Sequence, residues 1–229
     1  MWKNYPNIFE KTLSKLKLEL DINFCSLYPP WYLAGNWEDS SGKLLIVGLN
    51  PGVPRDDSWN QWLTKKTGFD KRNNLSWDNH KKFALNCFQI AYKEKKRHRH
   101  YTTLAKLVYS FYGEDPPSNN FKRYEFLNEK SVFCEMIPFY SDETKPKNQS
   151  VIADVIYSFY WAQLNEFISE RRFDKVIIMN KQSFDFEILY KLMNVDPQND
   201  RIGIELYPGE LTFCFKINIG RTNGLITPF

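Results

Sequence analysis

Four short apolar segments, separated by longer stretches of mixed polarity, form the main pattern along this chain. They lie at residues 43–49, 131–137, 173–179 and 211–219, and the first is followed directly by Asn-Pro-Gly. Short runs of this kind, bounded by turn residues, are typical of strands that are buried on both faces of a sheet. The pattern therefore predicts four strands.

Other parts of the chain repeat apolar residues at helical spacing. The predicted helices cover residues 7–20, about 79–93, 101–112, 150–171 and 181–193. Residues 53–78 are polar with several tryptophans and have no such period, so we expect a long irregular loop there. Long loops inside a compact domain are more often functional than structural, which makes this segment a candidate part of a site.

The alternation of strands and helices predicts an α/β protein. We expect a three-layer α/β/α sandwich with a central, mainly parallel four-stranded sheet. Since no linker or repeat divides the chain, we expect a single domain over residues 1–229, with 1–40 as an N-terminal helical extension. Ligands of such folds bind beyond the carboxyl ends of the strands. That rule directs attention to residues 48–55, 135–141 and 220–227.

The composition excludes several other classes of protein. Of the 229 residues, 42% are hydrophobic and 17% aromatic, which is a core-forming composition and not that of a disordered chain. No stretch approaches the roughly 18 apolar residues of a membrane helix, and the N-terminus has no signal-peptide pattern. The four cysteines lie far apart and form no CxxC pair. We therefore expect a cytoplasmic protein with reduced thiols and without a membrane partner.

The excess positive charge is confined to one short segment. The net charge is +4, and residues 93–100 alone hold five basic residues and one acidic residue. Such a patch could contact phosphates, and the candidate DNA-backbone contacts are Lys95, Lys96, Arg97 and Arg99. The alternative is an ordinary solvated surface, because charge runs are common there. His98 and His100 lack a partner at ligand spacing, so no metal site is expected.

A resemblance to a known family starts at the first strand. The segment Val47-Gly48-Leu49-Asn50-Pro51-Gly52 resembles the first motif of the uracil-DNA glycosylase superfamily, and most closely the Gly-x-Asn-Pro-Gly of its mismatch-specific and single-strand-selective branches. The stretch 135–139 falls where that superfamily has a strand ending in a base-recognition residue. The stretch 175–182 is similar to its third-strand segment, and 221–225 falls where its last motif lies. The resemblance spans roughly residues 40–229.

The sequence departs from the superfamily pattern in three respects. All three histidines precede residue 101, so the histidine of the last motif is absent. The cysteines do not match the iron–sulfur branches. Glu135 stands where the base-recognition residue is usually Asn. The resemblance therefore implies the fold more firmly than it implies a uracil substrate.

The resemblance implies a monofunctional DNA glycosylase that acts on a flipped nucleotide without a metal or cofactor. Asn50 would hold the attacking water, Asp56 could help to activate it, and Arg221 could stabilise the leaving base. The implied base-binding residues are Gly48, Pro51, Gly52, Phe69, Glu135 and Phe139, and Lys181 could contact phosphate. For each residue a structural role remains open: a packed turn, a core aromatic, a solvated acid, a surface cation or a helix start.

Glu135 is the most informative of these positions. An ionised carboxylate only accepts hydrogen bonds, so it would clash with the O4 acceptor of uracil, whereas it could accept from the exocyclic amine of cytosine. We therefore expect a modified cytosine or a phage-type base, in DNA repair or in defence against phage. The alternative is that Glu135 caps a loop or pairs with a cation.

Three other functions remain open. They are a catalytically inactive DNA-binding module, a uracil-DNA glycosylase proper, and an unrelated α/β enzyme acting on a small phosphorylated compound. The absence of a Gly-rich phosphate loop disfavours the last of these. The sequence does not reveal the oligomeric state, for which a monomer is the simplest expectation.

Overall fold

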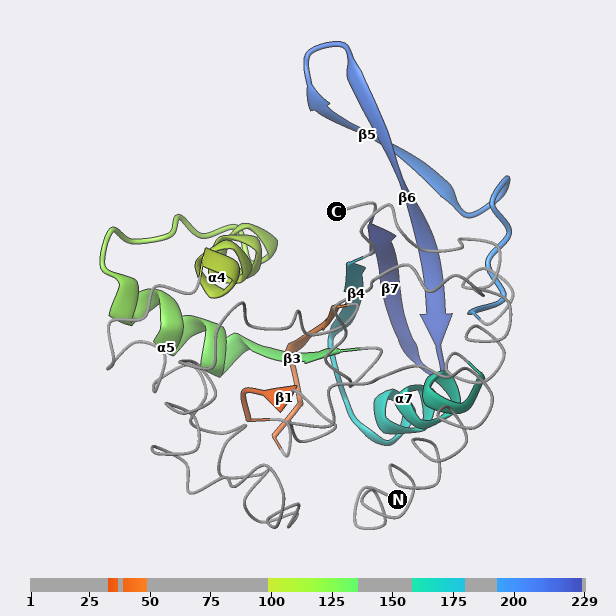
Figure 1. Ribbon diagram of the computed structural model, residues 1–229, viewed down its shortest axis with the longest axis horizontal. Helices are drawn as coiled ribbons and strands as arrows, with labels where there is room; N and C mark the ends of the chain where they lie inside the picture. Colours follow the sequence, from red (N-terminus) through yellow and green to blue (C-terminus); the bar gives the residue numbers. More distant parts are fainter. Residues whose placement is uncertain (1–32, 37–38, 49–98, 136–157, 180–192, 228–229) are drawn as a thin grey trace, which may run out of the picture.

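The computed structural model describes residues 33–36, 39–48, 99–135, 158–179 and 193–227 (Figure 1). These residues form one sheet with helices packed around it. The helices predicted at 7–20 and about 79–93, the loop predicted at 53–78, and all but the last residue of the helix predicted at 181–193 lie outside the described residues.

The described part of the chain contains a seven-stranded sheet with the order β1-β3-β2-β4-β7-β6-β5. The strands are β1 (Leu33–Ala34), β2 (Leu44–Gly48), β3 (Ser131–Glu135), β4 (Lys175–Met179), β5 (Arg201–Tyr207), β6 (Glu210–Ile219) and β7 (Thr222–Thr227). The four strands β3, β2, β4 and β7 run parallel, whereas β1, β6 and β5 are antiparallel to their neighbours. The sheet is therefore mixed.

The predicted strands at 43–49, 131–137, 173–179 and 211–219 are confirmed as β2, β3, β4 and β6 within the described residues, but the prediction of a four-stranded sheet was wrong, because the described sheet has seven strands. The segment 211–219 belongs to β6, which is antiparallel to its neighbour β7, and β7 takes the fourth parallel position. Only Gly220 and Arg221 join β6 to β7. Two residues can connect antiparallel strands but not parallel ones, which need a long crossover.

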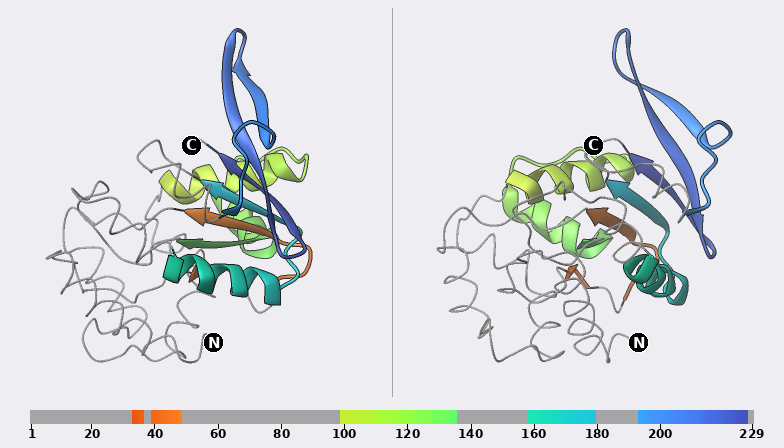
Figure 2. Two further views of the ribbon diagram at one scale, coloured as in Figure 1. Left: turned by 90° about the vertical axis from the view of Figure 1, so that its right-hand side faces the viewer. Right: turned by 45° about the vertical axis from the view of Figure 1, so that its right-hand side comes forward.

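Helices cover the sheet on both faces, as an α/β protein requires (Figure 2). Figures 1 and 2 show α4 (Arg99–Phe111) and α5 (Asn120–Lys130) on one side of the parallel strands and α7 (Ser158–Glu170) on the other. Every residue of β2 is buried as a result. The helix predicted at 101–112 is confirmed as α4, and α7 lies within the helix predicted at 150–171.

Helix α5 was not predicted from the sequence, and local hydrogen bonds explain where it begins and ends. The side chain of Asn119 caps its first turn by accepting a hydrogen bond from the backbone N–H of Phe121 (2.8 Å). At its far end the hydroxyl of Ser131 donates to the carbonyl oxygen of Leu127 (2.6 Å), where the chain passes directly into β3. Tyr109 of α4 stacks on Phe126 of α5 at 4.0 Å between ring centroids, which joins the two helices.

Gly224 determines how closely β7 approaches β4. A Cβ atom at this position would lie 2.5 Å from the carbonyl oxygen of Val176 and 3.0 Å from Cγ1 of Ile217. We therefore expect Gly224→Ala to lower the free energy of unfolding by about 1–3 kcal/mol, because the strands must separate or the Ile217 side chain must move. Denaturant unfolding measures this change. Asn223→Ala, at an exposed position on the same strand, is the matched control, and equal stability of the two variants would contradict the packing argument.

Candidate functional site

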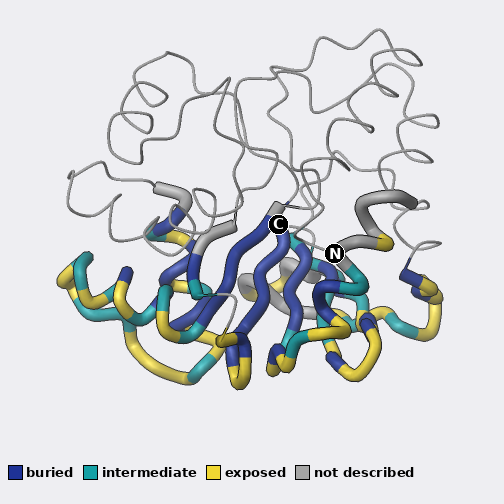
Figure 3. Tube along the Cα trace, turned by 90° about the horizontal axis from the view of Figure 1, so that it is seen from below, coloured by how far each residue is buried: buried dark blue, intermediate teal, exposed yellow. Residues whose placement is uncertain are grey.

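The carboxyl ends of the four parallel strands meet at one edge of the sheet. Figure 3 shows the buried segments of the chain running side by side. Gly48 at the end of β2 pairs with Glu135 at the end of β3, and Met179 at the end of β4 pairs with Thr227 at the end of β7. Val47 pairs with Ile178, which brings β2 and β4 into the same register. The hydroxyl of Thr227 also donates to the carbonyl oxygen of Ile178 (3.4 Å). These four strand ends therefore form a single row.

The strand order places a topological switch point within this row. From β2 the chain continues to β3 on one side of β2, and then crosses to β4 on the other side. In open α/β sheets, ligands bind outside the carboxyl ends of the strands where the order reverses in this way. The candidate functional site is therefore the carboxyl edge at β2 and β4, with β3 beside them.

Two of the predicted base-binding residues lie in this row. Gly48 is buried and is the last residue of β2, and Glu135 is its direct partner in β3. Arg99 is the first residue of α4. The remaining predicted residues lie outside the described residues: Asn50, Pro51, Gly52, Asp56, Phe69, Phe139, Lys95, Lys96, Arg97 and Lys181.

Arg221 is not brought together with Gly48 and Glu135. Residues 220 and 221 do follow the end of a strand, but that strand is β6, which runs antiparallel to β7, so its end lies at the opposite edge of the sheet, and residues 222–227 form β7 itself. Gly220 and Arg221 form the turn before β7, so they lie at its amino end. Gly220 is the first of the two residues of this hairpin turn and has φ +58. Two-residue hairpin turns commonly have glycine at this position, because its φ is positive. The five residue steps of β7 separate its first residue, Thr222, from the carboxyl edge by roughly 17 Å, and Arg221 precedes Thr222.

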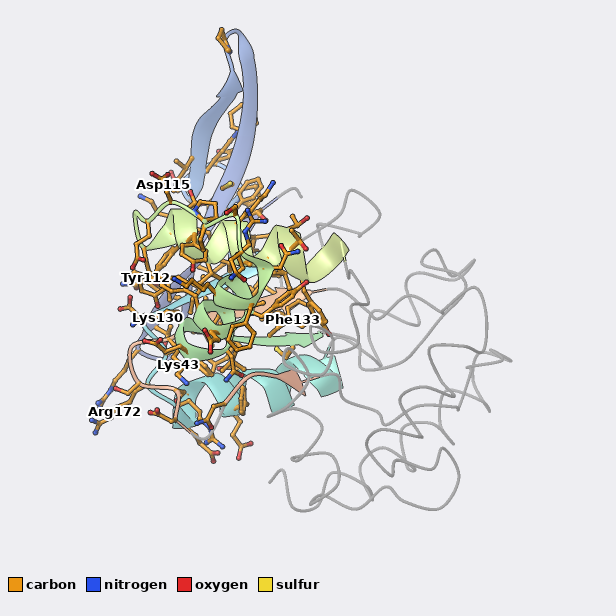
Figure 4. The ribbon with its side chains drawn as sticks, turned by 90° about the vertical axis from the view of Figure 1, so that its left-hand side faces the viewer. Lys43, Tyr112, Asp115, Lys130, Phe133 and Arg172 are labelled. Atoms are coloured by element: carbon orange, nitrogen blue, oxygen red, sulfur yellow. The ribbon has the colours of Figure 1, made fainter. Side chains whose placement is uncertain are left out.

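The opposite, amino edge of the sheet contains polar groups that the sequence analysis missed (Figure 4). Lys43 is only 7% exposed, and its Nζ donates to the carbonyl oxygen of Asn36 (3.3 Å). The hydroxyl of Tyr112 lies 2.9 Å from the carbonyl oxygen of Gly42 and 3.2 Å from that of Lys130. These contacts attach α4 and α5 to the start of β2. They lie a full strand length from the candidate site, so they support the scaffold and not the site.

Burial lowers the pKa of Lys43, although the carboxylates of Asp39 and Glu129 oppose that shift. A lysine directly before a buried strand is visible in the sequence, but its surroundings are not, because they include Glu129 and Lys130 of α5, which are distant in the chain. A perturbed pKa can mark a functional site, yet structural groups show the same behaviour.

The lowered pKa of Lys43 predicts a pH dependence of stability. Between the folded-state pKa and the unfolded value of about 10.4, the unfolded chain holds more protons. We therefore expect the free energy of unfolding to rise with pH across that window in the wild type and to lack this rise in Lys43→Met. Denaturant titrations of both proteins at several alkaline pH values test this.

The comparison with Lys43→Met also removes an opposing effect. Burial raises the pKa values of Tyr109 and Tyr112, so their contribution to stability falls as pH rises above about 10. This contribution is common to both proteins and cancels in their difference. A wild-type stability that falls relative to Lys43→Met over the same window would contradict the burial of a charged Lys43.

Within the described ranges, no group of three or more His, Cys, Asp or Glu side chains could hold a metal ion. None of the helices described here is both long and apolar enough to cross a bilayer. Fold and strand order define an α/β protein with a mixed sheet. Comparisons with protein-family models, curated proteins and solved structures found no significant match.

Proposed function

We propose that this protein is a monofunctional DNA glycosylase that hydrolyses the N-glycosidic bond of a flipped, cytosine-derived or phage-type modified base and leaves an abasic site. The observation that carries the proposal is the pairing of Gly48 with Glu135. These residues belong to the two segments that, by resemblance to the uracil-DNA glycosylase superfamily, hold the attacking water and recognise the base. The two segments start side by side.

Chain geometry supports a shared site for these groups. Adjacent strands are about 4.8 Å apart, and two residues of extended chain span at most about 7 Å. The Cα atom of Asn50, two residues after Gly48, is therefore within about 12 Å of the Cα atom of Glu135. Glycine in a strand also permits close approach of a ligand to the backbone. A single nucleotide could thus contact both segments.

The proposed chemistry follows from the residue types. Bond cleavage leaves positive charge on the sugar and negative charge on the base. The Asn50 amide has no useful pKa, so it orients water without removing its proton, which suits a path in which the sugar cation forms first. The carboxylate of Glu135 accepts a hydrogen bond from the exocyclic amine of the base.

The fold proposed with this function is the uracil-DNA glycosylase-like α/β/α sandwich. Support comes from the order of elements: the motif-bearing strand β2 is central, with β3 on one side and β4 on the other. In the same proposal, Pro51, Gly52, Phe69 and Phe139 surround the base and Asp56 assists the water. The residues that hold the DNA backbone in this proposal are Lys95, Lys96, Arg97, Arg99 and Lys181.

The position of Arg221 favours a second candidate function. Without Arg221 at the carboxyl edge, and without a histidine after residue 100, the leaving base lacks the cations considered for its stabilisation. A DNA-binding module that has lost catalysis would have these features. Salt-dependent DNA binding without any abasic product would favour it over the glycosylase.

A screen of defined DNA substrates tests the proposed function. Purified protein is incubated with single- and double-stranded oligonucleotides that contain uracil, cytosine or 5-modified cytosines, and abasic sites are scored as alkali-labile breaks. We expect cleavage at a modified cytosine and little at uracil. A hydrogen bond to a charged group contributes about 1.5–3 kcal/mol, so Glu135→Ala should reduce this excision by at least about tenfold. Efficient uracil release by the wild type, lost in Glu135→Ala, would overturn the substrate assignment.

A further inference from the structure

The hairpin of β5 and β6 extends beyond the rest of the sheet. Strand β6 pairs with β7 only from Phe215 to Ile219, whereas residues 210–214 pair with β5 alone among the described strands. We call β5 together with residues 210–214 the arm, and Figures 1 and 2 show it projecting away from the helices and the parallel strands. An isolated two-stranded hairpin is marginally stable in water, so a third strand beside the arm would stabilise it.

The arm has an open edge along β5, which is the last strand in the sheet order of the described residues. The backbone N–H of Lys216 in β6 donates to the carbonyl oxygen of Asp200 (2.8 Å). Because alternate residues of an antiparallel strand bond to the same neighbour, Ile202 and Ile204 direct their backbone groups toward β6. Arg201, Gly203 and Glu205 direct theirs to the open edge.

The sequence along this edge is complementary to itself. It runs Arg-Ile-Gly-Ile-Glu over residues 201–205, with opposite charges at equal distances from Gly203. We propose that two copies of this chain associate through antiparallel pairing of β5 with β5, about a two-fold axis at Gly203. The three residues with outward backbone groups then pair with one another, so the backbones can form six hydrogen bonds across the axis.

The charges in this register are complementary. Arg201 stands opposite Glu205 of the partner subunit, and the two-fold axis repeats the pair. Opposite charges at directly opposed positions stabilise a strand pair, and like charges destabilise it. A shift of two residues along the strand would remove this match, so the charges select the register.

A cation–π contact with β6 orders the side chain of Arg201 on one face of the arm. Its guanidinium carbon lies 3.2 Å from the centroid of the Phe213 ring. Phe213 is the β6 partner of Gly203, which has no side chain to cover the ring. The cation–π contact holds Arg201 in place, so less of its conformational freedom is lost on association. Because a single strand pair is a small interface, we expect a weak, concentration-dependent dimer.

Charge exchange tests the proposal with matched variants. Sedimentation equilibrium at concentrations up to about 100 μM should give a mass approaching twice the 27.3 kDa chain for the wild type. Arg201→Glu and Glu205→Arg each place like charges opposite one another at both pairs, so each should weaken the dimer by about tenfold or more. The double variant, or an equimolar mixture of the two single variants, should restore it.

A backbone variant tests the pairing geometry independently of charge. The N–H of Gly203 points outward, so Gly203→Pro leaves the hydrogen bonds to β6 intact and should abolish the dimer. In the wild type, the amides of Arg201, Gly203 and Glu205 should exchange with solvent more slowly as concentration rises, while circular dichroism checks that each variant folds. A wild type that is monomeric throughout, or a dimer unaffected by the charge and Gly203→Pro variants, would overturn the proposal.

Discussion

Replacing Asn50 by alanine is expected to reduce abasic-site formation by about 100-fold or more, because misplacement of a reacting group by about 1 Å already costs that much. The amide would hold the attacking water against the developing sugar cation, and alanine offers no hydrogen-bonding group to replace it. Single-turnover assays on the substrate identified by the screen measure this effect. The loss should appear in the rate constant at saturating protein, not in the affinity for DNA.

The control for Asn50→Ala is the affinity for the same DNA, which should stay close to that of the wild type. Phosphate contacts provide most of the affinity in such complexes, and the alanine variant leaves them unchanged. Activity that survives the substitution would remove Asn50 from the mechanism. Loss of binding together with activity would point to a structural role of the Asn-Pro-Gly turn.

Among the substitutions considered, Phe133→Ala is expected to lower the free energy of unfolding the most. Phe133 lies in the middle of β3, has no exposed surface, and is paired in register with Ile46 of β2. Truncation of a buried phenylalanine removes its transfer free energy and leaves a cavity, so the free energy of unfolding should fall by about 3–5 kcal/mol. Denaturant unfolding followed by circular dichroism measures the change.

Phe111→Ala is the matched control, because it removes the same side chain from a position that is 37% exposed at the end of α4. Phe111→Ala should lower the free energy of unfolding by less than about 1 kcal/mol. This value combines the small effect of a typical surface substitution with the loss of a weak ring contact with Tyr112. Similar losses in Phe111→Ala and Phe133→Ala would contradict the position of the core at β2 and β3.

The strands of the core could be predicted from the sequence because a strand that is buried on both faces is a run of consecutive apolar residues. All five residues of β2 are apolar or glycine, and all are buried. Helix α4 was predictable for a related reason, since one side of it is apolar at helical spacing. Helix α5 was missed because only Tyr124 and Leu127 of its residues are buried, so its pattern is weak.

The fourth parallel strand, β7, could not be predicted in the same way. Strand β7 has the sequence TNGLIT, which contains few β-branched apolar residues and a glycine. Its strand conformation depends on β4 and β6, its neighbours on either side, and Gly224 is suited to that narrow space. The sequence predicted no strand there, and residues 220–227 were expected beyond the carboxyl ends of the parallel strands, so Arg221 was expected at the wrong edge.

For the candidate site, the sequence alone determined which strands carry the motifs, because a buried strand followed by Asn-Pro-Gly is a local pattern. The tertiary structure alone decided which strand ends meet. It brought Gly48 beside Glu135 and moved Arg221 to the opposite edge. The physical reason is that strand order and direction arise from hydrogen bonds between segments far apart in the chain, which no local pattern of residues records.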